Sequence, residues 1–189
     1  MGGKMKKFIL DYAGNPRGWI GKFLLKTMDL GHVSLIDWTM GILDIKESDI
    51  IWDIGCGSGK AIEIMALKAQ KVYGIDRADL SIQQSRERNS QKIQEGKVEI
   101  IKMDVDDLSF SPASFDLITA FATISFWENL DKNLKDIYEL LTPNGRFVVI
   151  GENVLRYSYD DLKKFMERAN FKRIQYHSND KEKLLIGFK

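Results

Sequence analysis

One stretch near residue 50 limits the possible folds of this chain most strongly. Residues 49–59 read Asp-Ile-Ile-Trp-Asp-Ile-Gly-Cys-Gly-Ser-Gly, and a segment with helical apolar spacing follows. The apolar run from Ile50 to Trp52 predicts a buried strand, and glycines at alternate positions allow a tight turn without a Cβ atom in the way. A strand, a glycine-rich turn and a helix in this order predict a nucleotide-type cofactor site beside a helix N-terminus.

Three kinds of glycine-rich loop can follow such a strand. A phosphate-binding P-loop needs Gly, four residues and then Gly-Lys-Ser/Thr, but its first position is Ile54 and its last is Ala61. A dinucleotide loop needs a third glycine at the place of Lys60. The third kind, Asp-x-Gly-x-Gly-x-Gly, is matched at all four positions, by Asp53, Gly55, Gly57 and Gly59.

This loop resembles motif I of the class I methyltransferases that use S-adenosylmethionine (SAM). SAM carries a cationic sulfonium and an ammonium group and no phosphate, so the carboxylate of Asp53 suits it and would repel a pyrophosphate. The resemblance implies SAM as the cofactor and S-adenosylhomocysteine as the product, with contacts from Asp53, Gly55, Cys56, Gly57 and Gly59. Residues 55–59 are hereafter called the glycine loop. Cys56, inside this loop, is interpreted as a small filler and not as a nucleophile, because no base is adjacent.

Strand and helix patterns alternate after the loop. Apolar runs predict strands at residues 71–75, 98–102, 115–120, 146–150, 172–177 and 184–188. Helical patterns cover residues 61–69, 79–94, 130–141 and 158–169, and Ser158 with Asp161 resembles a capping box. Residues 142–145, Thr-Pro-Asn-Gly, are predicted to end the preceding helix before the fifth strand.

This alternation predicts a parallel sheet with helices on both faces, while the short last turn makes the final two strands antiparallel neighbours. The arrangement is similar to the class I methyltransferase fold, a three-layer Rossmann-like α/β sheet of seven strands in the order 3-2-1-4-5-7-6 with an antiparallel last strand. We expect one domain over residues 1–189, with a helical lid in residues 1–48 and the core in residues 49–189. The lid helices are expected near residues 18–30 and 34–43.

Acidic residues follow three successive strands. Asp76 lies 23 residues after Asp53, a spacing that suits a carboxylate accepting both ribose hydroxyls in SAM or in a dinucleotide. Asp104 follows the third strand, where the family resemblance implies a hydrogen bond to the adenine amino group, with Arg77 and Val105 beside the ring. The resemblance also implies that the segment after the fourth strand passes the methionine part of SAM, through Ala120 and Phe121.

The acceptor is expected to bind under the N-terminal lid. His32 is a candidate general base, although packing or capping is the commoner role of such a histidine, and Trp19, Trp38 and Trp127 either line the acceptor pocket or pack in the core. The patterns Asn-Pro-x-Gly-x-x-Gly from residue 15 and Gly-His-x-x-Leu-x-x-Trp from residue 31 resemble the branch near the ubiquinone and menaquinone methyltransferases.

The composition of the chain limits its possible binding partners and its location. Net charge is +1, from 28 basic and 27 acidic residues, so no nucleic-acid partner is expected. One cysteine excludes an internal disulfide and predicts no metal site, and no apolar run reaches the length of a membrane span. We therefore expect a cytoplasmic monomer or homodimer that methylates a small molecule. Methylation of RNA or protein, and SAM binding without catalysis, are the alternatives.

Overall fold

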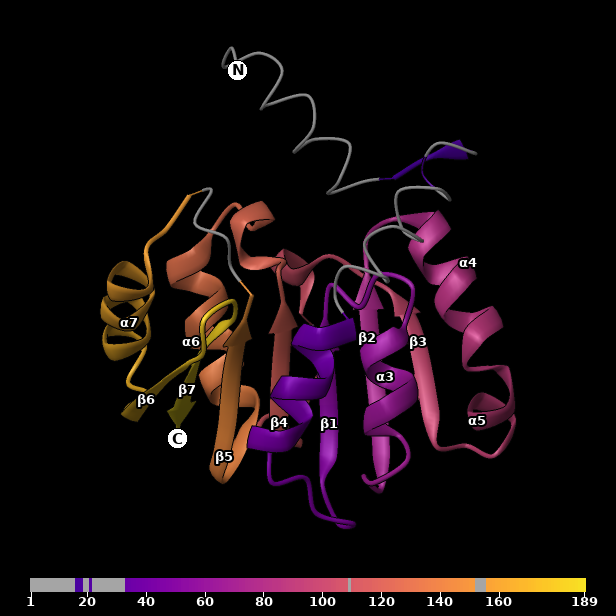
Figure 1. Cartoon of the computed structure of the whole chain (residues 1–189), viewed down its shortest axis with the longest axis horizontal. Coiled ribbons are helices and arrows are strands. Elements are labelled where there is room, and N and C mark those ends of the chain that lie inside the picture. Colours follow the sequence, from indigo (N-terminus) through magenta and orange to yellow (C-terminus); the bar gives the residue numbers. More distant parts are fainter. Residues whose placement is uncertain (1–15, 19–20, 22–32, 109, 152–155) are drawn as a thin grey trace.

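The computed structural model describes residues 16–18, 21, 33–108, 110–151 and 156–189 of the chain. These residues contain one 7-stranded sheet in the order β3-β2-β1-β4-β5-β7-β6 (Figure 1). The strands are β1 (Ile50–Ile54), β2 (Lys71–Asp76), β3 (Val98–Lys102), β4 (Phe115–Phe121), β5 (Leu141–Ile150), β6 (Lys172–Ser178) and β7 (Lys183–Phe188). The pairs among β1 to β5 are parallel, and β7 runs antiparallel to both β5 and β6. The predicted α/β class and strand order are confirmed.

Helices cover both faces of this sheet, as Figure 1 shows. They are a helical segment at residues 33–42, α3 (Lys60–Met65), α4 (Asp79–Arg88), α5 (Ser90–Gln94), α6 (Leu130–Leu140) and α7 (Tyr159–Arg168). The first segment, α3 and α4 contribute to one apolar cluster with Ile51 and Leu117 of the sheet. The helices α6 and α7 contribute to a second cluster with Trp52 and Ile118. Successive strand residues thus face opposite layers, which is the period of two of a β-strand.

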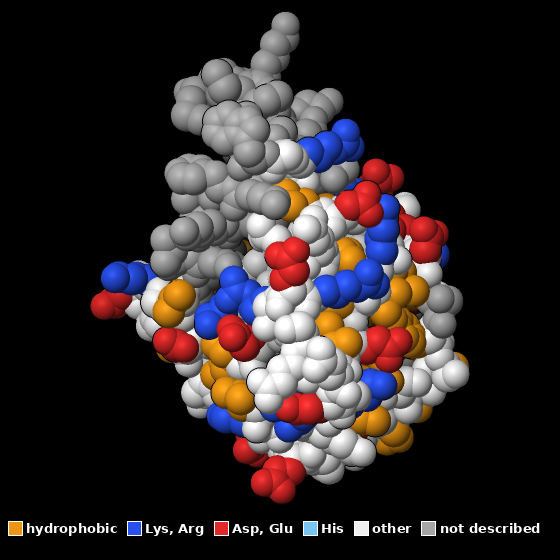
Figure 2. All heavy atoms as spheres, turned by 90° about the vertical axis from the view of Figure 1, so that its right-hand side faces the viewer, with side chains coloured by type: hydrophobic (Ala, Val, Ile, Leu, Met, Phe, Trp, Pro, Cys, Tyr) orange, Lys and Arg blue, Asp and Glu red, His pale blue; other side chains and the backbone are white. Residues whose placement is uncertain are grey.

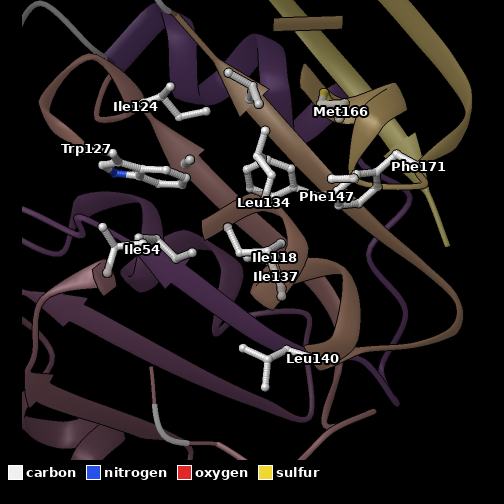
Figure 3. Close-up of a cluster of buried hydrophobic side chains, with 14 of the residues drawn as sticks. Ile54, Ile118, Ile124, Trp127, Leu134, Ile137, Leu140, Phe147, Met166 and Phe171 are labelled. Atoms are coloured by element: carbon white, nitrogen blue, oxygen red, sulfur yellow. The ribbon is translucent and has the colours of Figure 1, made fainter. Parts of the chain in front are cut away.

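The second cluster is drawn in Figure 3, where side chains of α6 meet those of the central strands. Leu134 and Ile137, three residues apart on α6, are fully buried together with Phe147 of β5. On the C-terminal side, Ser158 is the N-cap of α7: its side chain accepts a hydrogen bond from the Asp161 N–H, and the Asp161 carboxylate accepts one from the Ser158 N–H. The predicted capping box is confirmed.

Several element boundaries differ from the sequence predictions, and α3, for example, ends at Met65 and not at residue 69. The helix expected at residues 79–94 is two helices, because the Asn89 side-chain amide donates to the Ser85 carbonyl at 2.9 Å and ends α4. The fifth strand begins at Leu141 and not at Arg146, since Leu141 pairs with Phe115 before a register shift. Residues 142–145 therefore form an irregularity within β5, which tolerates Pro143.

The helical segment at residues 33–42, where the sequence predicts a helix of the N-terminal lid, packs on the sheet. Leu35, Ile36 and Met40 are buried in the same cluster as Ile51, and Trp38 packs against that cluster. Most of the remaining expected lid, with His32 and Trp19, lies outside the described residues. The lid and the single-domain extent stay predictions. Within the described part of the chain, none of the helices has the length and hydropathy to cross a bilayer.

Candidate cofactor-binding site

The carboxyl ends of β1, β2, β3 and β4 meet around one pocket. Its walls come from the segments that follow these strands, from the start of α4 and from the N-terminal part of the chain. The lining residues are Pro16, Ile54, Gly55, Gly57, Ile75, Asp76, Arg77, Ser81, Met103, Asp104, Val105, Phe121, Ala122, Thr123, Phe126 and Trp127. Ligands of open parallel sheets bind at this edge, beyond the strand carboxyl ends.

Asp76 connects the glycine loop to the start of α4. One of its carboxyl oxygens accepts a hydrogen bond from the Gly57 N–H at 3.0 Å, and the other accepts from the Ala78 N–H at 2.8 Å. Burial raises the pKa of the Asp76 carboxyl above its ordinary value, and these two N–H donors oppose the rise. Each oxygen has a second lone pair, so the carboxylate can also accept hydrogen bonds from two hydroxyls of a ligand.

Asp104 and Arg77 lie on the neighbouring part of the wall. Asp104 Oδ1 accepts from the Asp106 N–H at 3.2 Å and so caps the short 3₁₀ helix at Val105–Asp107. Asp104 Oδ2 is 3.8 Å from Arg77 Nη1, and both side chains stay partly exposed. The structure therefore brings together Asp76, Arg77, Asp104 and Val105 at one pocket.

The three glycines of the loop all have left-handed backbone angles but differ in surroundings. A Cβ atom at Gly55 would lie 2.8 Å from Thr123 Cβ, and one at Gly59 would lie 2.6 Å from Asn89 Nδ2. A Cβ atom at Gly57 would meet nothing within 4 Å. Gly55 and Gly59 thus permit close packing within the protein, while Gly57 leaves open space in the pocket wall.

Four predicted cofactor residues lie behind the wall and not in it. They are Asp53, Cys56, Gly59 and Ala120, and direct contact between any of them and a cofactor stays a prediction. The Cys56 thiol points to α4, with Sγ 4.0 Å from Ser85 Oγ. Burial raises the pKa of this thiol well above its ordinary value, which keeps it neutral, as expected of a filler.

Asp53 is a buried acid directly below the loop. Its side chain accepts a hydrogen bond from Thr119 Oγ1 at 2.7 Å, from the adjacent strand β4. Burial raises the pKa of Asp53 to about 7, although the Thr119 hydrogen bond opposes the rise and the nearby Asp76 adds to it. Because this pKa is near neutral, a cation that binds nearby would favour the ionised form of the carboxyl.

A mainly apolar wall follows β4. Phe121 ends the strand, and Ala122 then adopts a left-handed φ of 49° while its N–H donates to the Ile150 carbonyl at 2.8 Å. A non-glycine residue in this region is strained by about 1–2 kcal/mol. The turn places Thr123 against Gly55. Trp127 is 3% exposed, and its ring stacks on Phe147 with centroids 6.4 Å apart, so it belongs to both the core and the pocket.

Several lining residues were not predicted from the sequence. Ser81 lies inside α4, where it lowers the pKa of the Asp76 carboxyl, and a serine at such a position carries no local signal. Thr123 and Met103 lie within three residues of predicted strand ends, which was the only available indication. Their part in the pocket depends on how the loops fold back.

Comparison with known proteins decides the family. A family model described as a methyltransferase domain matches residues 52–149, which is more than half of the chain. The chain belongs to this methyltransferase family. Together with the strand order and the glycine loop, the match identifies the protein as a class I SAM-dependent methyltransferase.

Relatives of this methyltransferase act on several acceptors. It is 28% identical over 107 residues to the sterol 4-C-methyltransferase strm-1 of Caenorhabditis elegans, a match that covers 57% of this chain and 32% of the relative. It is 25% identical over 144 residues to the 27-O-demethylrifamycin SV methyltransferase of Amycolatopsis mediterranei, which covers 76% of this chain and 53% of the relative. The chain thus spans between a third and about half of the length of these two relatives.

A solved structure shows the same fold. The methyltransferase in the complex with the Trm112 methyltransferase activator from Haloferax volcanii superposes with a TM-score of 0.77 at 18% identity. The superposition covers 90% of this chain and 95% of that one. At this identity the likeness concerns the fold alone.

The pocket of this methyltransferase fits SAM on two observations. Gly57 leaves a part of the wall open that any side chain would fill. Two carboxylates, Asp76 and Asp104, provide hydrogen-bond acceptors beside it, and no phosphate is present in SAM for them to repel.

The different surroundings of the glycines predict different defects in two variants. Gly57→Ala is expected to cost about 1–2 kcal/mol of stability from backbone strain, and its Cβ would enter the pocket, so SAM binding should weaken strongly. Gly55→Ala has the same strain plus a collision with Thr123, so it should unfold at clearly lower urea concentration. Urea titration and calorimetric titration with SAM measure both effects. Unchanged SAM affinity in Gly57→Ala would contradict this assignment.

Proposed function

We propose that this methyltransferase transfers the methyl group of SAM to a small-molecule acceptor. The observation that carries the proposal is the position of Asp76, Asp104 and the open face of Gly57 around one pocket at the strand carboxyl ends. In this proposal Asp76 accepts the ribose hydroxyls and Asp104 accepts the adenine amino group. Val105 and Arg77 flank the adenine ring, and Asp53 supplies negative charge below the cationic end of the cofactor.

The chemistry needs alignment more than a catalytic side chain. When bound, SAM supplies an electrophilic methyl group on a good leaving group. The protein holds the cofactor through the glycine loop and Asp76, while Phe121, Phe126 and Trp127 form an apolar wall that excludes water and orients the acceptor. Thr123 places a hydroxyl beside the loop, where it can hydrogen-bond either substrate. We assign no general base, because the candidate His32 lies outside the described residues.

An uncharged acceptor fits the wall after β4. Phe121, Ala122, Phe126 and Trp127 carry no charge, and Thr123 is the polar side chain among them. The two relatives are named as methyltransferases of a sterol and of a demethylrifamycin, which are both small molecules. These relatives are longer than this chain, so the acceptor class is inferred from the wall as much as from the relatives.

Methylation of a macromolecule is the main alternative. On the face formed by α4, α5 and the β3 edge, Figure 2 shows basic and acidic side chains interspersed. RNA binding is expected to need a continuous basic surface, so this face does not favour an RNA substrate. A SAM-binding protein without catalysis would share the pocket, and only a methyl-transfer assay with candidate acceptors distinguishes it from an enzyme. Monomer or homodimer assembly, the cytoplasmic location and the resemblance to the quinone-biosynthesis branch stay predictions.

Removing the Asp76 carboxylate tests the cofactor site. Asp76→Ala is expected to weaken SAM binding by roughly 10- to 150-fold, because the ribose hydroxyls lose a charged hydrogen-bond acceptor. Asp76→Asn keeps one oxygen acceptor, so its SAM affinity should lie between those of the wild type and Asp76→Ala. Asp79→Ala removes a carboxylate three residues further on, whose side chain is 85% exposed, and should bind SAM like the wild type.

The measurement is calorimetric titration with SAM, S-adenosylhomocysteine and NAD. We expect the unmodified protein to bind the first two and not the third. Micromolar NAD binding without SAM binding would overturn the proposed function. Equal SAM affinity in the wild type and in Asp76→Ala would overturn the role of Asp76 alone.

A further inference from the structure

We propose that Arg88 and Asn89, at the C-terminal end of α4, are positioning residues that hold the glycine loop in the shape that binds SAM. Neither residue is part of the pocket wall, so each would act through the loop backbone. The inference rests on the proposed SAM-dependent function, because it concerns the affinity of the same site.

The two side chains donate hydrogen bonds to backbone carbonyl groups at the end of the glycine loop. Arg88 Nε donates to the Ser58 carbonyl at 3.0 Å, and Asn89 Nδ2 donates to the Gly59 carbonyl at 3.2 Å. Asn89 is 2% exposed, and its amide also donates to the Ser85 carbonyl, which fixes its orientation. Arg88 Nη1 is 3.5 Å from the Glu63 carboxylate on α3, so it also connects α4 to the helix that follows the loop.

The beginning of α4 holds the other part of the same loop. The Asp76 carboxylate accepts from the Gly57 N–H and from the Ala78 N–H, and Ala78 is the N-cap of α4. The loop is therefore linked to both ends of α4, through the Asp76 carboxylate, which also binds the N-cap of the helix, and through Arg88 and Asn89 at its C-terminal end. Asn89 also limits the loop sterically, because any Cβ atom at Gly59 would collide with its amide.

Backbone hydrogen bonds within the protein also hold the loop. The N–H groups of Gly55 and Cys56 donate to the Ile75 carbonyl at 2.8 and 2.9 Å, and the Gly59 N–H donates to the Cys56 carbonyl at 2.9 Å. These hydrogen bonds hold the loop on the side that faces the protein, while Gly57 stays open to the pocket. A binding loop fixed in advance loses less conformational freedom when the ligand binds, which raises affinity.

A matched arginine on the same helix separates this role from ordinary stabilisation. Arg86 donates to the Ile100 carbonyl on β3, with Nη2 at 2.8 Å, so it makes the same kind of contact as Arg88 but not to the loop. Arg88→Met and Arg86→Met therefore each remove an arginine-to-carbonyl bond from α4, and Arg88→Met also removes the exposed contact with Glu63. Arg88→Lys keeps a cationic donor and serves as the conservative rescue.

The test is calorimetric titration of the full chain with SAM, beside hydrogen exchange of the free protein. We expect Arg88→Met and Asn89→Ala to raise the SAM dissociation constant about 3- to 10-fold, the equivalent of one lost hydrogen bond. Amide exchange at residues 57–59 should accelerate in both variants, while β4 and β5 exchange as before. Arg88→Lys should recover most of the affinity. The SAM dissociation constant of Arg86→Met should stay within about twofold of the wild-type value.

Each outcome decides the proposal. Wild-type affinity in Arg88→Met, or an equal loss in Arg86→Met, would overturn it while leaving the SAM-dependent function in place. If the wild type itself does not bind SAM, the proposed function fails and this inference fails with it. Should Asn89→Ala not fold because its buried amide is lost, Arg88→Met decides alone, since the Arg88 side chain is 29% exposed and outside the core.

Discussion

Replacing Arg146 with methionine is expected to lower the free energy of unfolding by about 3–5 kcal/mol. Arg146 Nη2 is 2.9 Å from Asp49 Oδ2 and 2.8 Å from the Asp44 carbonyl. The side chains of Arg146 and Asp49 are only 14% and 6% exposed. The variant keeps the chain length but leaves the Asp49 carboxylate buried and without its counter-charge. The segment before β1 would also lose its tie to β5.

Urea unfolding measures this loss of stability, and two further variants serve as a rescue and as a control. The double variant Arg146→Met with Asp49→Asn should recover part of the stability, because the buried charge is gone. Lys163→Met breaks the ion pair with Glu167, whose side chains are both 52% exposed, and should cost less than about 0.5 kcal/mol. A loss as small as this in Arg146→Met would show that the Arg146–Asp49 pair does not anchor the sheet.

Replacing Asp53 with asparagine is expected to stabilise the free protein above neutral pH, by on the order of 4 kcal/mol at pH 8. Burial raises the pKa of Asp53 from 3.8 to about 7 in the folded protein. The folded state therefore binds the proton more tightly than the unfolded state. This contribution to stability is complete below pH 3.8 and disappears as the pH rises through about 7. Asparagine stays neutral and can still accept the Thr119 hydrogen bond.

Unfolding by urea at several pH values between 5 and 8.5 tests the sign as well as the size. The gain of Asp53→Asn over the wild type should grow with pH and flatten above the folded pKa. A gain that is constant with pH, or a loss at pH 8, would contradict the burial of an ionisable carboxyl at this position. A residue that costs stability is commonly retained for binding, in agreement with a role of Asp53 beside a cationic cofactor.

The strand–loop–helix unit was predictable because its signals are local. Alternating glycines, a buried apolar run and an acid at the strand end all lie within residues 49–59. The positive φ angles of Gly55, Gly57 and Gly59 confirm the need for glycine there. The alternation of strands and helices, with one short final turn, likewise predicted a parallel sheet that ends in an antiparallel pair, and the family resemblance implied its strand order.

Element boundaries were less predictable where a side chain or a distant strand decides them. Asn89 ends α4 by bonding the Ser85 carbonyl, and no helical period reveals that choice. Leu141 joins β5 because Phe115 lies opposite it, which the apolar pattern of residues 146–150 cannot show. The sequence predicts a helix near residues 34–43 and the family resemblance implies a lid there, but only packing shows that the apolar side chains of residues 33–42 meet the sheet.

The sequence alone indicated the cofactor class and predicted candidate residues around it, because a glycine loop and strand-end acids impose backbone and charge requirements within a few positions. The tertiary structure decided which of these residues face the pocket. Gly57, Asp76 and Asp104 line it, whereas Asp53, Cys56 and Gly59 lie behind it. It also brought Arg88 and Asn89 back to the loop from about thirty residues away. Such contacts depend on how α4 returns across the sheet, and spacing along the chain does not encode that path.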